Sequence, residues 1–196
     1  MATKGRKKIV ICVAGMTGCG KSTVARRLAE RYGLRYLSGG HALKALAVEM
    51  GYKPHERGWW ETEEGMKFLR QRMINPKFDR MVDEKLIEEA RRGNLVLDSW
   101  TMPWLLKEGF KVWLEASLDV RAKRAAQRDR ISFEKSLDAV KEKDEQTKTI
   151  YKNLYAFDLG EDFSPFDLIL DTNMLEAEEV FQTICMVIDR LLIKKT

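Results

Sequence analysis

The sequence predicts a three-layer α/β fold in which helices cover both faces of a five-stranded parallel sheet. The chain has 196 residues, which suits one domain with one sizeable core. Hydrophobic residues make up 44% of it, enough for a packed globule. Short apolar runs alternate with longer amphipathic ones, as in βα proteins with a parallel sheet. No internal repeat or low-complexity linker divides the chain, so we treat residues 1–196 as a single domain.

The expected strands are short and apolar. Residues 8–14 form a nearly continuous apolar run rich in β-branched side chains, which is typical of a strand buried on both faces. The other expected strands are residues 34–37, 95–98, 112–115 and 168–170. Amphipathic periodicity predicts a helix over residues 21–32, ended by Gly33. Further helices are expected near residues 41–50, 63–73, 77–92, 118–130, 133–156 and 176–192.

Two stretches depart from this regular pattern. Residues 51–75 contain Pro54, Gly58, the pair Trp59-Trp60 and Gly65, which suggests an insert that moves or faces a partner. Residues 121–152, called the lid segment below, form a densely charged helical pair that could close over a ligand.

Composition narrows the function classes. The net charge of +5 favours an anionic partner, either nucleotide phosphates or nucleic acid. The basic residues are spread through the helices, so a nucleic-acid surface is disfavoured without being excluded. Three cysteines and two histidines show no metal-ligand spacing, and reduced thiols are expected. No apolar run is long enough to cross a bilayer, and we expect a cytoplasmic monomer.

The strongest motif follows the first strand. Residues 15–23 satisfy the pattern G-x-x-x-x-G-K-[ST] and lie between an expected strand and an expected helix, where a phosphate-binding P-loop belongs. A chance glycine turn is the alternative, and the strand and helix on either side disfavour it. The motif predicts a P-loop NTPase fold with bound ATP and Mg²⁺. The expected nucleotide-binding residues are Gly15, Met16, Thr17, Gly18, Cys19, Gly20, Lys21, Ser22 and Thr23.

Individual roles follow from the chemistry of phosphates. Lys21 should reach the β- and γ-phosphates, the Ser22 hydroxyl should bind Mg²⁺, and Thr23 should meet an α-phosphate oxygen. Cys19 could be a redox switch, but a small residue that fills the loop is the favoured interpretation. Asp98 ends an apolar strand and should hold Mg²⁺ directly or through water, while capping of a following helix is the alternative.

Together with the P-loop, three later regions of the sequence resemble those of a known family. The first region is Tyr36-Leu-Ser38-Gly39-Gly40 together with Lys44. The second runs from Asn75 through Asp83 to Asp98. The third begins with Lys111 to Arg121 and continues with Arg124, Arg128, Tyr151 to Asp158 and Phe166 to Thr172. In order and spacing these segments resemble the short archaeal-type cytidylate kinases, a branch of the nucleoside monophosphate kinases. The resemblance spans roughly residues 9–172.

The resemblance implies Mg²⁺-dependent transfer of a phosphoryl group from ATP to CMP or dCMP, with UMP as a further acceptor. It also implies that the 51–75 insert belongs to the monophosphate site and that residues 121–152 form a helical lid. The catalytic residues it implies are Lys21, Arg124 and Arg128. The substrate-binding residues it implies are Ser38, Lys44, Asp79, Arg80 and Asp83. For the two arginines and the two aspartates, a solvated charged helix face is the competing interpretation.

Several positions depart from the family pattern. Lys44 and the pair Ser99-Trp100 stand where the family has arginine and Gly-Arg, and the expected lid arginines fall at Lys143 and Ile150. Lysine lacks the bidentate fork of arginine, and isoleucine carries no charge.

These departures leave the acceptor open. Candidate substitutes for the lost cations are Arg57, Arg70, Arg72 and Arg80. Trp59, Trp60, Trp100 and Trp104 could stack on a planar substrate, although packing is the commoner role of tryptophan. A kinase for another small molecule or an RNA end, and a nucleotide-dependent binding protein with weak transfer, remain alternatives to the monophosphate kinase.

Overall fold

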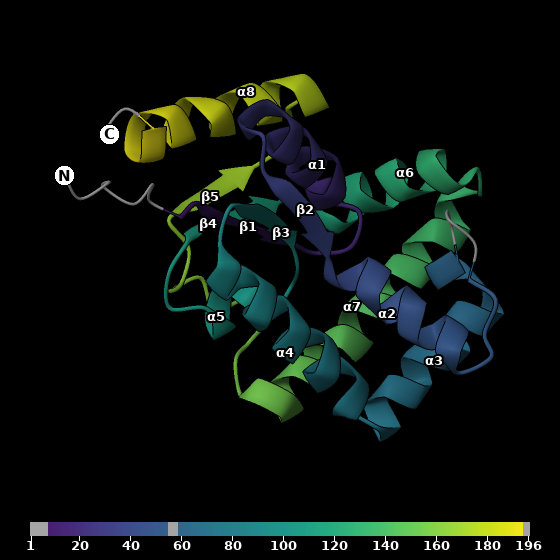
Figure 1. The fold of residues 1–196 in the computed structure, drawn as a ribbon. Coiled ribbons are helices and arrows are strands. Elements are labelled where there is room, and N and C mark those ends of the chain that lie inside the picture. The colour runs from purple at the N-terminus through teal and green to yellow at the C-terminus, as the bar shows by residue number, and fades with distance from the viewer. Residues whose placement is uncertain (1–7, 55–58, 194–196) are drawn as a thin grey trace.

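The computed structural model describes residues 8–54 and 59–193, and it confirms the predicted parallel sheet of five strands. The strands are β1 (Val10–Gly15), β2 (Arg35–Ser38), β3 (Leu95–Asp98), β4 (Phe110–Glu115) and β5 (Leu168–Asp171). They lie in the order β2-β3-β1-β4-β5, and every neighbouring pair is parallel. The first strand is therefore central, with β3 and β4 on its two sides (Figure 1).

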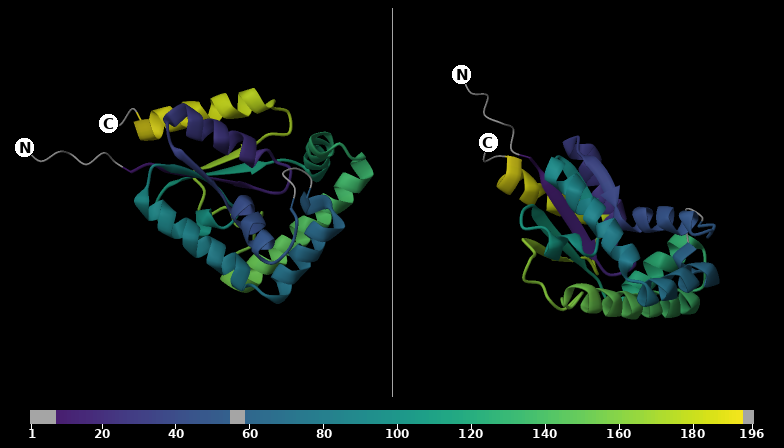
Figure 2. Two further views of the ribbon diagram at one scale, coloured as in Figure 1. Left: turned by 45° about the vertical axis from the view of Figure 1, so that its right-hand side comes forward. Right: turned by 60° about the horizontal axis from the view of Figure 1, so that its bottom comes forward.

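Alternate residues of β1 build two cores, one on each face of the sheet. Ile11 and Val13 are fully buried in a cluster with α1 (Lys21–Tyr32) and α8 (Ala177–Ile188). Cys12 faces the opposite side, against α4 (Lys77–Arg92) and α2 (Gly39–Glu49). Both faces being covered explains why the strand is a continuous apolar run rather than an alternating one. Figures 1 and 2 show α1 and α8 together on one side of the sheet.

Three further helices gather beyond the carboxyl ends of the strands. They are α3 (Glu63–Ile74), α6 (Leu118–Asp129) and α7 (Phe133–Tyr155), and Figure 1 shows them with α2 past that edge of the sheet. Ser38, Asp98 and Val13 lie side by side in register, so the chain leaves β2, β3 and β1 into the same region. In open parallel sheets this edge is where ligands bind.

The predicted helices all exist, with small shifts at their ends. Helix α2 begins at Gly39, two residues before the predicted start, because the Ser38 hydroxyl accepts a hydrogen bond from the His41 amide as an N-cap. Two short elements were not predicted: η1 (Trp59–Glu61) and α5 (Met102–Leu105). At the C-terminal end, α8 passes at Asp189 into the π-helix η2 (Asp189–Ile193). No helix within the described ranges is long and apolar enough to cross a membrane.

Candidate functional site

The loop after β1 has the backbone geometry of a phosphate cradle. Gly18 has φ of 83° and Gly20 has φ of 98°, a region that favours glycine. A Cβ atom at Gly18 would lie 2.5 Å from the Arg121 carbonyl oxygen, so no other residue fits there without displacement. At Gly20 a Cβ atom would meet nothing within 4 Å, because that side of the loop is open. Glycine at position 18 thus allows a close contact with Arg121 of the lid segment, whereas glycine at position 20 lies on the open side of the loop.

Helix α1 begins directly after this loop and leaves its first turn available for an anion. Its N-cap is Gly20, no side chain caps it, and its first turn carries no acidic residue. Elsewhere in the chain Ser38, Thr62, Ser117 and Ser132 each cap a helix with a side-chain oxygen. The uncapped amides and the helix dipole of α1 together suit a phosphate group.

Lys21, the first residue of α1, points along this loop toward Trp100. Its Nζ atom donates to the Met16 carbonyl oxygen at 3.5 Å and lies 4.9 Å from the centre of the Trp100 ring. The Trp100 indole N–H in turn donates to the Gly15 carbonyl oxygen at 2.7 Å. Trp100 therefore contacts the cradle at its first glycine and at its lysine.

An ion pair from the lid segment holds the centre of the loop. The Thr17 amide donates to Asp144 at 3.2 Å, and Arg121 donates to the Thr17 carbonyl at 2.9 Å. Arg121 and Asp144 also pair with each other, and both are buried. The Thr17 hydroxyl is buried without a hydrogen-bond partner, and Thr17 faces the pocket. The lid segment is thus docked on the phosphate loop in this structure.

Two oxygen donors at the strand edge suit a magnesium ion. Ser22 and Asp98 line the same pocket, Ser22 from the first turn of α1 and Asp98 from the tip of β3. Asp98 accepts a hydrogen bond from the Tyr36 hydroxyl at 3.0 Å. The capping alternative for Asp98 is wrong, because the Ser99 hydroxyl accepts from the amides of Thr101 and Met102 instead. Within the described ranges no three His, Cys, Asp or Glu side chains cluster as metal ligands.

A buried ion pair stands on the opposite side of the pocket. Arg72 from α3 donates to both carboxylate oxygens of Asp79 from α4, and its Nη2 also donates to the Tyr151 hydroxyl at 3.4 Å. Both charged side chains are about 1% exposed. Burial alone would lower the pKa of Arg72, but Asp79 and Tyr151 raise it, so the guanidinium stays charged. The pair joins α3, α4 and α7 at one point.

Asp83 lies one helical turn beyond Asp79 and faces the pocket. Its carboxylate accepts hydrogen bonds from the Thr101 hydroxyl at 2.6 Å and the Tyr155 hydroxyl at 2.8 Å. Burial raises the pKa of Asp83 to about 6, and the two hydroxyl donors oppose that rise. The solvated-helix interpretation of Asp79 and Asp83 is therefore wrong, since both are at most 5% exposed.

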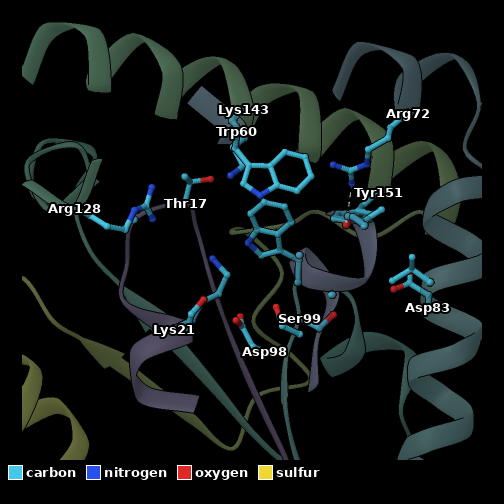
Figure 3. Close-up of a pocket in the computed structure, with 18 residues that line it drawn as sticks. Thr17, Lys21, Trp60, Arg72, Asp83, Asp98, Ser99, Arg128, Lys143 and Tyr151 are labelled. Atoms are coloured by element: carbon cyan, nitrogen blue, oxygen red, sulfur yellow. Dashed lines mark hydrogen bonds between the residues drawn. The ribbon is translucent and has the colours of Figure 1, made fainter. Parts of the chain in front are cut away.

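One pocket of about 150 Å³ connects the two sides. Figure 3 shows Thr17, Lys21 and Arg128 on one side, Arg72, Tyr151 and Asp83 on the other, and Trp60 with Lys143 between them. We call the first group, with Ser22 and Asp98, the donor half. The second group, with Ser38 and Trp60, is the acceptor half. The walls come from the phosphate loop, α1, α2, η1, α3, α4, the segment after β3, α6 and α7.

The structure brings only some of the predicted site residues to this pocket. Thr17, Gly18, Lys21, Ser22, Ser38, Asp83, Asp98 and Arg128 line it. Lys44 and Arg80 do not; Arg80 is exposed on α4, and Lys44 is half-buried on α2. Asp79 lies behind Arg72 rather than in the wall. Among the other candidate cations, Arg70 pairs with Glu142 at the surface, while Arg57, with His55 and Gly58 of the same insert, lies outside the described residues.

The two lid arginines predicted to act together are directed to different places. Arg128 lines the pocket and also pairs with Asp129. Arg124 donates to the Thr172 hydroxyl at 3.0 Å and to the carbonyl oxygens of Thr172 and Leu175, and at 3.5 Å to the Cys19 carbonyl oxygen of the phosphate loop. It is half-buried and joins α6 to the segment after β5. The four-residue spacing predicted one shared face; in the structure Arg128 lines the pocket, whereas Arg124 contacts the phosphate loop at Cys19 without lining the pocket.

The tryptophans and Cys19 also separate into distinct environments. Trp59 is fully buried, and Trp104 stacks on Phe157 with ring centres 4.2 Å apart, so these two serve packing. Trp60 and Trp100 line the pocket. Cys19 is 2% exposed, and burial raises the pKa of its thiol, which supports the small-residue interpretation over the redox switch.

Sequence reasoning missed two arrangements here. Arg72 and Asp79 lie seven residues apart on helices separated by Asn75-Pro76, so no spacing rule within one helix connects them. Arg121 and Asp144 belong to two helices of the lid segment, and nothing in their sequence neighbourhood indicates that both contact Thr17. The sequence shows that each of these positions is charged, but it does not show which residue each one pairs with in the fold.

The amino-acid sequence is similar to that of known cytidylate kinases. Residues 10–174 match the sequence profile of the Cytidylate kinase-like family. The chain is 34% identical over 187 residues to a cytidylate kinase of Pyrococcus horikoshii, covering 95% of this chain and 91% of that one. It is 33% identical over 188 residues to a cytidylate kinase of Methanocaldococcus jannaschii, covering 93% and 99%.

Solved structures share the fold at lower identity. A shikimate kinase from Acinetobacter baumannii in complex with shikimate superimposes with a TM-score of 0.55 at 22% identity, covering 95% of this chain and 96% of that one. An uncharacterized protein from Eubacterium ventriosum reaches a TM-score of 0.60 at 17% identity, covering 93% and 99%. These likenesses support the predicted P-loop kinase architecture.

Proposed function

The chain belongs to the cytidylate kinase-like family, and from this we propose that it transfers the γ-phosphoryl group of ATP to CMP or dCMP. The observation that carries the proposal is the single pocket in which an open phosphate loop faces Ser38 and Asp83. Phosphoryl transfer needs positioning and charge neutralisation more than covalent chemistry from the protein, and this pocket provides both.

The donor half would hold the triphosphate. The loop amides and the first turn of α1 would bind the β-phosphate, and Lys21 would reach toward the γ-phosphate. When Mg²⁺ is bound it neutralises charge on the triphosphate, and Ser22 and Asp98 are the residues that would hold it. An oxygen of the acceptor's 5′-phosphate forms the new bond to the γ-phosphorus while the bond to the β,γ-bridging oxygen breaks. The products are ADP and a nucleoside diphosphate.

The acceptor half would hold the monophosphate nucleotide. Ser38 lies at the entry of α2, and Asp83 presents a carboxylate, mostly ionised at pH 7, that can accept from an exocyclic amine such as that of cytosine. A volume of about 150 Å³ is below the roughly 300 Å³ at which small-molecule sites begin. We infer that α2, η1 or the lid segment moves outward when a whole nucleotide enters. The lid role of residues 121–152 and the acceptor role of residues 51–75 belong to this proposal, as do a cytoplasmic location and a monomeric state.

The test is transfer from γ-labelled ATP to a panel of CMP, dCMP, UMP, AMP, GMP, shikimate and 5′-hydroxyl RNA. Lys21→Ala serves as the blank. We expect transfer selective for CMP or dCMP. Selective transfer to another member of the panel would overturn the acceptor assignment. Retained ATP binding with no transfer to any of them would indicate a nucleotide-dependent binding protein.

A further inference from the structure

Trp100 spans the pocket from the donor half to the acceptor half. On the donor side its indole N–H donates to the Gly15 carbonyl oxygen at 2.7 Å, and Lys21 Nζ lies over its ring, 4.9 Å from the ring centre. On the acceptor side the ring meets that of Tyr151, with ring centres 6.3 Å apart and planes at 64°. Figure 3 shows Lys21 and Tyr151 on opposite sides of the pocket, and Trp100 contacts both. The indole therefore lies where the two substrates would meet.

The surface that Trp100 presents to the pocket is apolar. The side chain is half-buried, because part of it packs against the core cluster that contains Met16 and Tyr151 while the rest lines the pocket. The N–H is the one hydrogen-bonding group of an indole, and the Gly15 carbonyl oxygen already accepts from it. The ring is thus held in place from two directions and offers the pocket only carbon atoms.

An apolar surface at this place matters because water competes with the acceptor. In the proposed reaction Lys21 reaches the γ-phosphate, so a ring 4.9 Å from its Nζ atom borders the γ-phosphate site. In hydrolysis a water oxygen forms the new bond to the γ-phosphorus while the bond to the β,γ-bridging oxygen breaks. ADP and inorganic phosphate leave, and the proton of the water passes to solvent. A water held for this attack needs polar partners, and the indole face supplies none.

We propose that Trp100 is a specificity-determining residue that excludes water from the γ-phosphate site, so that the phosphoryl group goes to the acceptor nucleotide. The inference rests on the proposed function for the position of the γ-phosphate, and it goes further by assigning the choice between transfer and hydrolysis to one side chain. Water exclusion is a general means of preventing hydrolysis in a closed site. Trp100 stands where the family pattern has an arginine, so this barrier belongs to the present sequence.

The experiment compares ATP hydrolysis and phosphoryl transfer in the wild type and in Trp100→Ala. Release of inorganic phosphate is measured with ATP and Mg²⁺ alone, and again with CMP. We expect hydrolysis without acceptor to rise about 10-fold in Trp100→Ala, the scale of holding one ordered water in place. With CMP present, the fraction of ATP lost to hydrolysis should also rise. A ring that only positioned Lys21 would give the opposite sign, because its loss would slow hydrolysis and transfer together.

Two control variants separate the ring face from its hydrogen bond and from packing. Trp100→Phe keeps an aromatic face and removes the N–H that meets Gly15. Trp104→Ala removes an indole that stacks on Phe157 beside the same core cluster and does not line the pocket. Both variants should hydrolyse ATP within about twofold of the wild-type rate, because each keeps the barrier at the γ-phosphate site.

The proposal stays testable if Trp100→Ala does not fold, as judged by circular dichroism. Trp100→Gln then replaces it, because the longer side chain fills more of the space and its amide offers a water molecule a partner. Hydrolysis should rise in this variant too. A folded Trp100→Ala or Trp100→Gln protein that hydrolyses ATP no faster than the wild type would overturn the inference. An equal rise in Trp104→Ala would also overturn it, since loosened packing would then explain the effect.

Failure of this inference can be told apart from failure of the proposed function. If the wild type does not phosphorylate CMP, the acceptor assignment fails, and hydrolysis measured with ATP and Mg²⁺ alone still tests Trp100. If CMP is phosphorylated while hydrolysis is unchanged in a folded Trp100→Ala protein, only the role of Trp100 fails.

Discussion

The donor and acceptor halves of the pocket are built in different ways. The donor half is mostly one continuous stretch, residues 15–23, whose backbone conformation sets the site. The acceptor half is made of side chains from the end of β2, η1, α3, α4 and α7, which meet because of tertiary packing. The first can be recognised in a sequence because its residues are neighbours in the chain. The second depends on partners far away, such as Arg72 with Tyr151, 79 residues apart.

The two halves also differ in how they treat charge. The donor half leaves the α1 amides uncapped, ready for an anion. The acceptor half encloses carboxylates with their own partners, Asp79 with Arg72 and Asp83 with Thr101 and Tyr155. A substitution in the donor half should therefore impair chemistry and leave folding intact. A substitution behind the acceptor half should impair folding first.

The largest expected effect tests the first part of that contrast. Lys21→Ala should lower kcat at least ~10³-fold, since removing a cation that neutralises a transferring phosphoryl group has costs of this order. The side chain is only half-buried and contacts the Met16 carbonyl and the Trp100 ring, so the fold should survive. Circular dichroism and urea unfolding alongside the kinetics check both statements. An unfolded variant would mean that Lys21 supports packing rather than charge.

The next largest expected effect tests whether a substitution behind the acceptor half impairs folding. Asp79→Ala leaves the Arg72 guanidinium buried without its bidentate partner, and breaking such a pair costs roughly 3–5 kcal/mol in the free energy of unfolding. Glu88→Ala is the matched control, because Glu88 pairs with Arg92 at the surface, where ion pairs contribute about 0–1 kcal/mol. Urea titrations of the two variants should differ accordingly. Equal midpoints would show that Arg72 finds another partner or water.

A smaller effect concerns the pH dependence of stability. The pKa of Asp83 is about 6 in the folded chain against an ordinary value of 3.8, so the folded state holds this proton over a range where the unfolded state has released it. Stability should therefore fall as pH rises from about 4 to 6, by at most ~3 kcal/mol at about 1.4 kcal/mol per pKa unit. Asp83→Asn should flatten this slope. Unfolding free energies at pH 4, 5, 6 and 7 for both proteins measure it, and parallel curves would assign the slope to other groups.

The sequence predicted the donor half of the pocket better than the acceptor half. The five strands, the parallel sheet and the phosphate loop were predicted because apolar runs and glycine spacing are local signals. Lys44 and Arg80 were predicted as acceptor contacts from the family pattern, and the structure places neither in the pocket wall. Arg124 shows what spacing cannot predict: it shares a helix with Arg128, yet it donates to the Thr172 hydroxyl, to two carbonyl oxygens after β5 and to the Cys19 carbonyl oxygen. Such a partner is set by the fold and leaves no mark within the helix itself.

The smallest expected effect is on the Mg²⁺ dependence of activity and concerns Asp98. Asp98→Asn removes a negative charge from the tip of β3 while keeping an oxygen that can accept from the Tyr36 hydroxyl, so the local structure should be retained. If Asp98 helps to hold Mg²⁺, the concentration of Mg²⁺ that gives half-maximal activity should rise about 10-fold, because second-shell and carboxylate changes at metal sites commonly have effects of 10–100-fold. Tyr36→Phe is the companion variant, and it should shift the Mg²⁺ titration less, since it removes a neutral donor to Asp98 and no metal ligand. A Mg²⁺ titration of Asp98→Asn that superimposes on that of the wild type would place the metal wholly on Ser22, phosphates and water. The carboxylate at the tip of β3 would then serve to orient the Tyr36 side chain of the neighbouring strand β2 rather than to bind the metal.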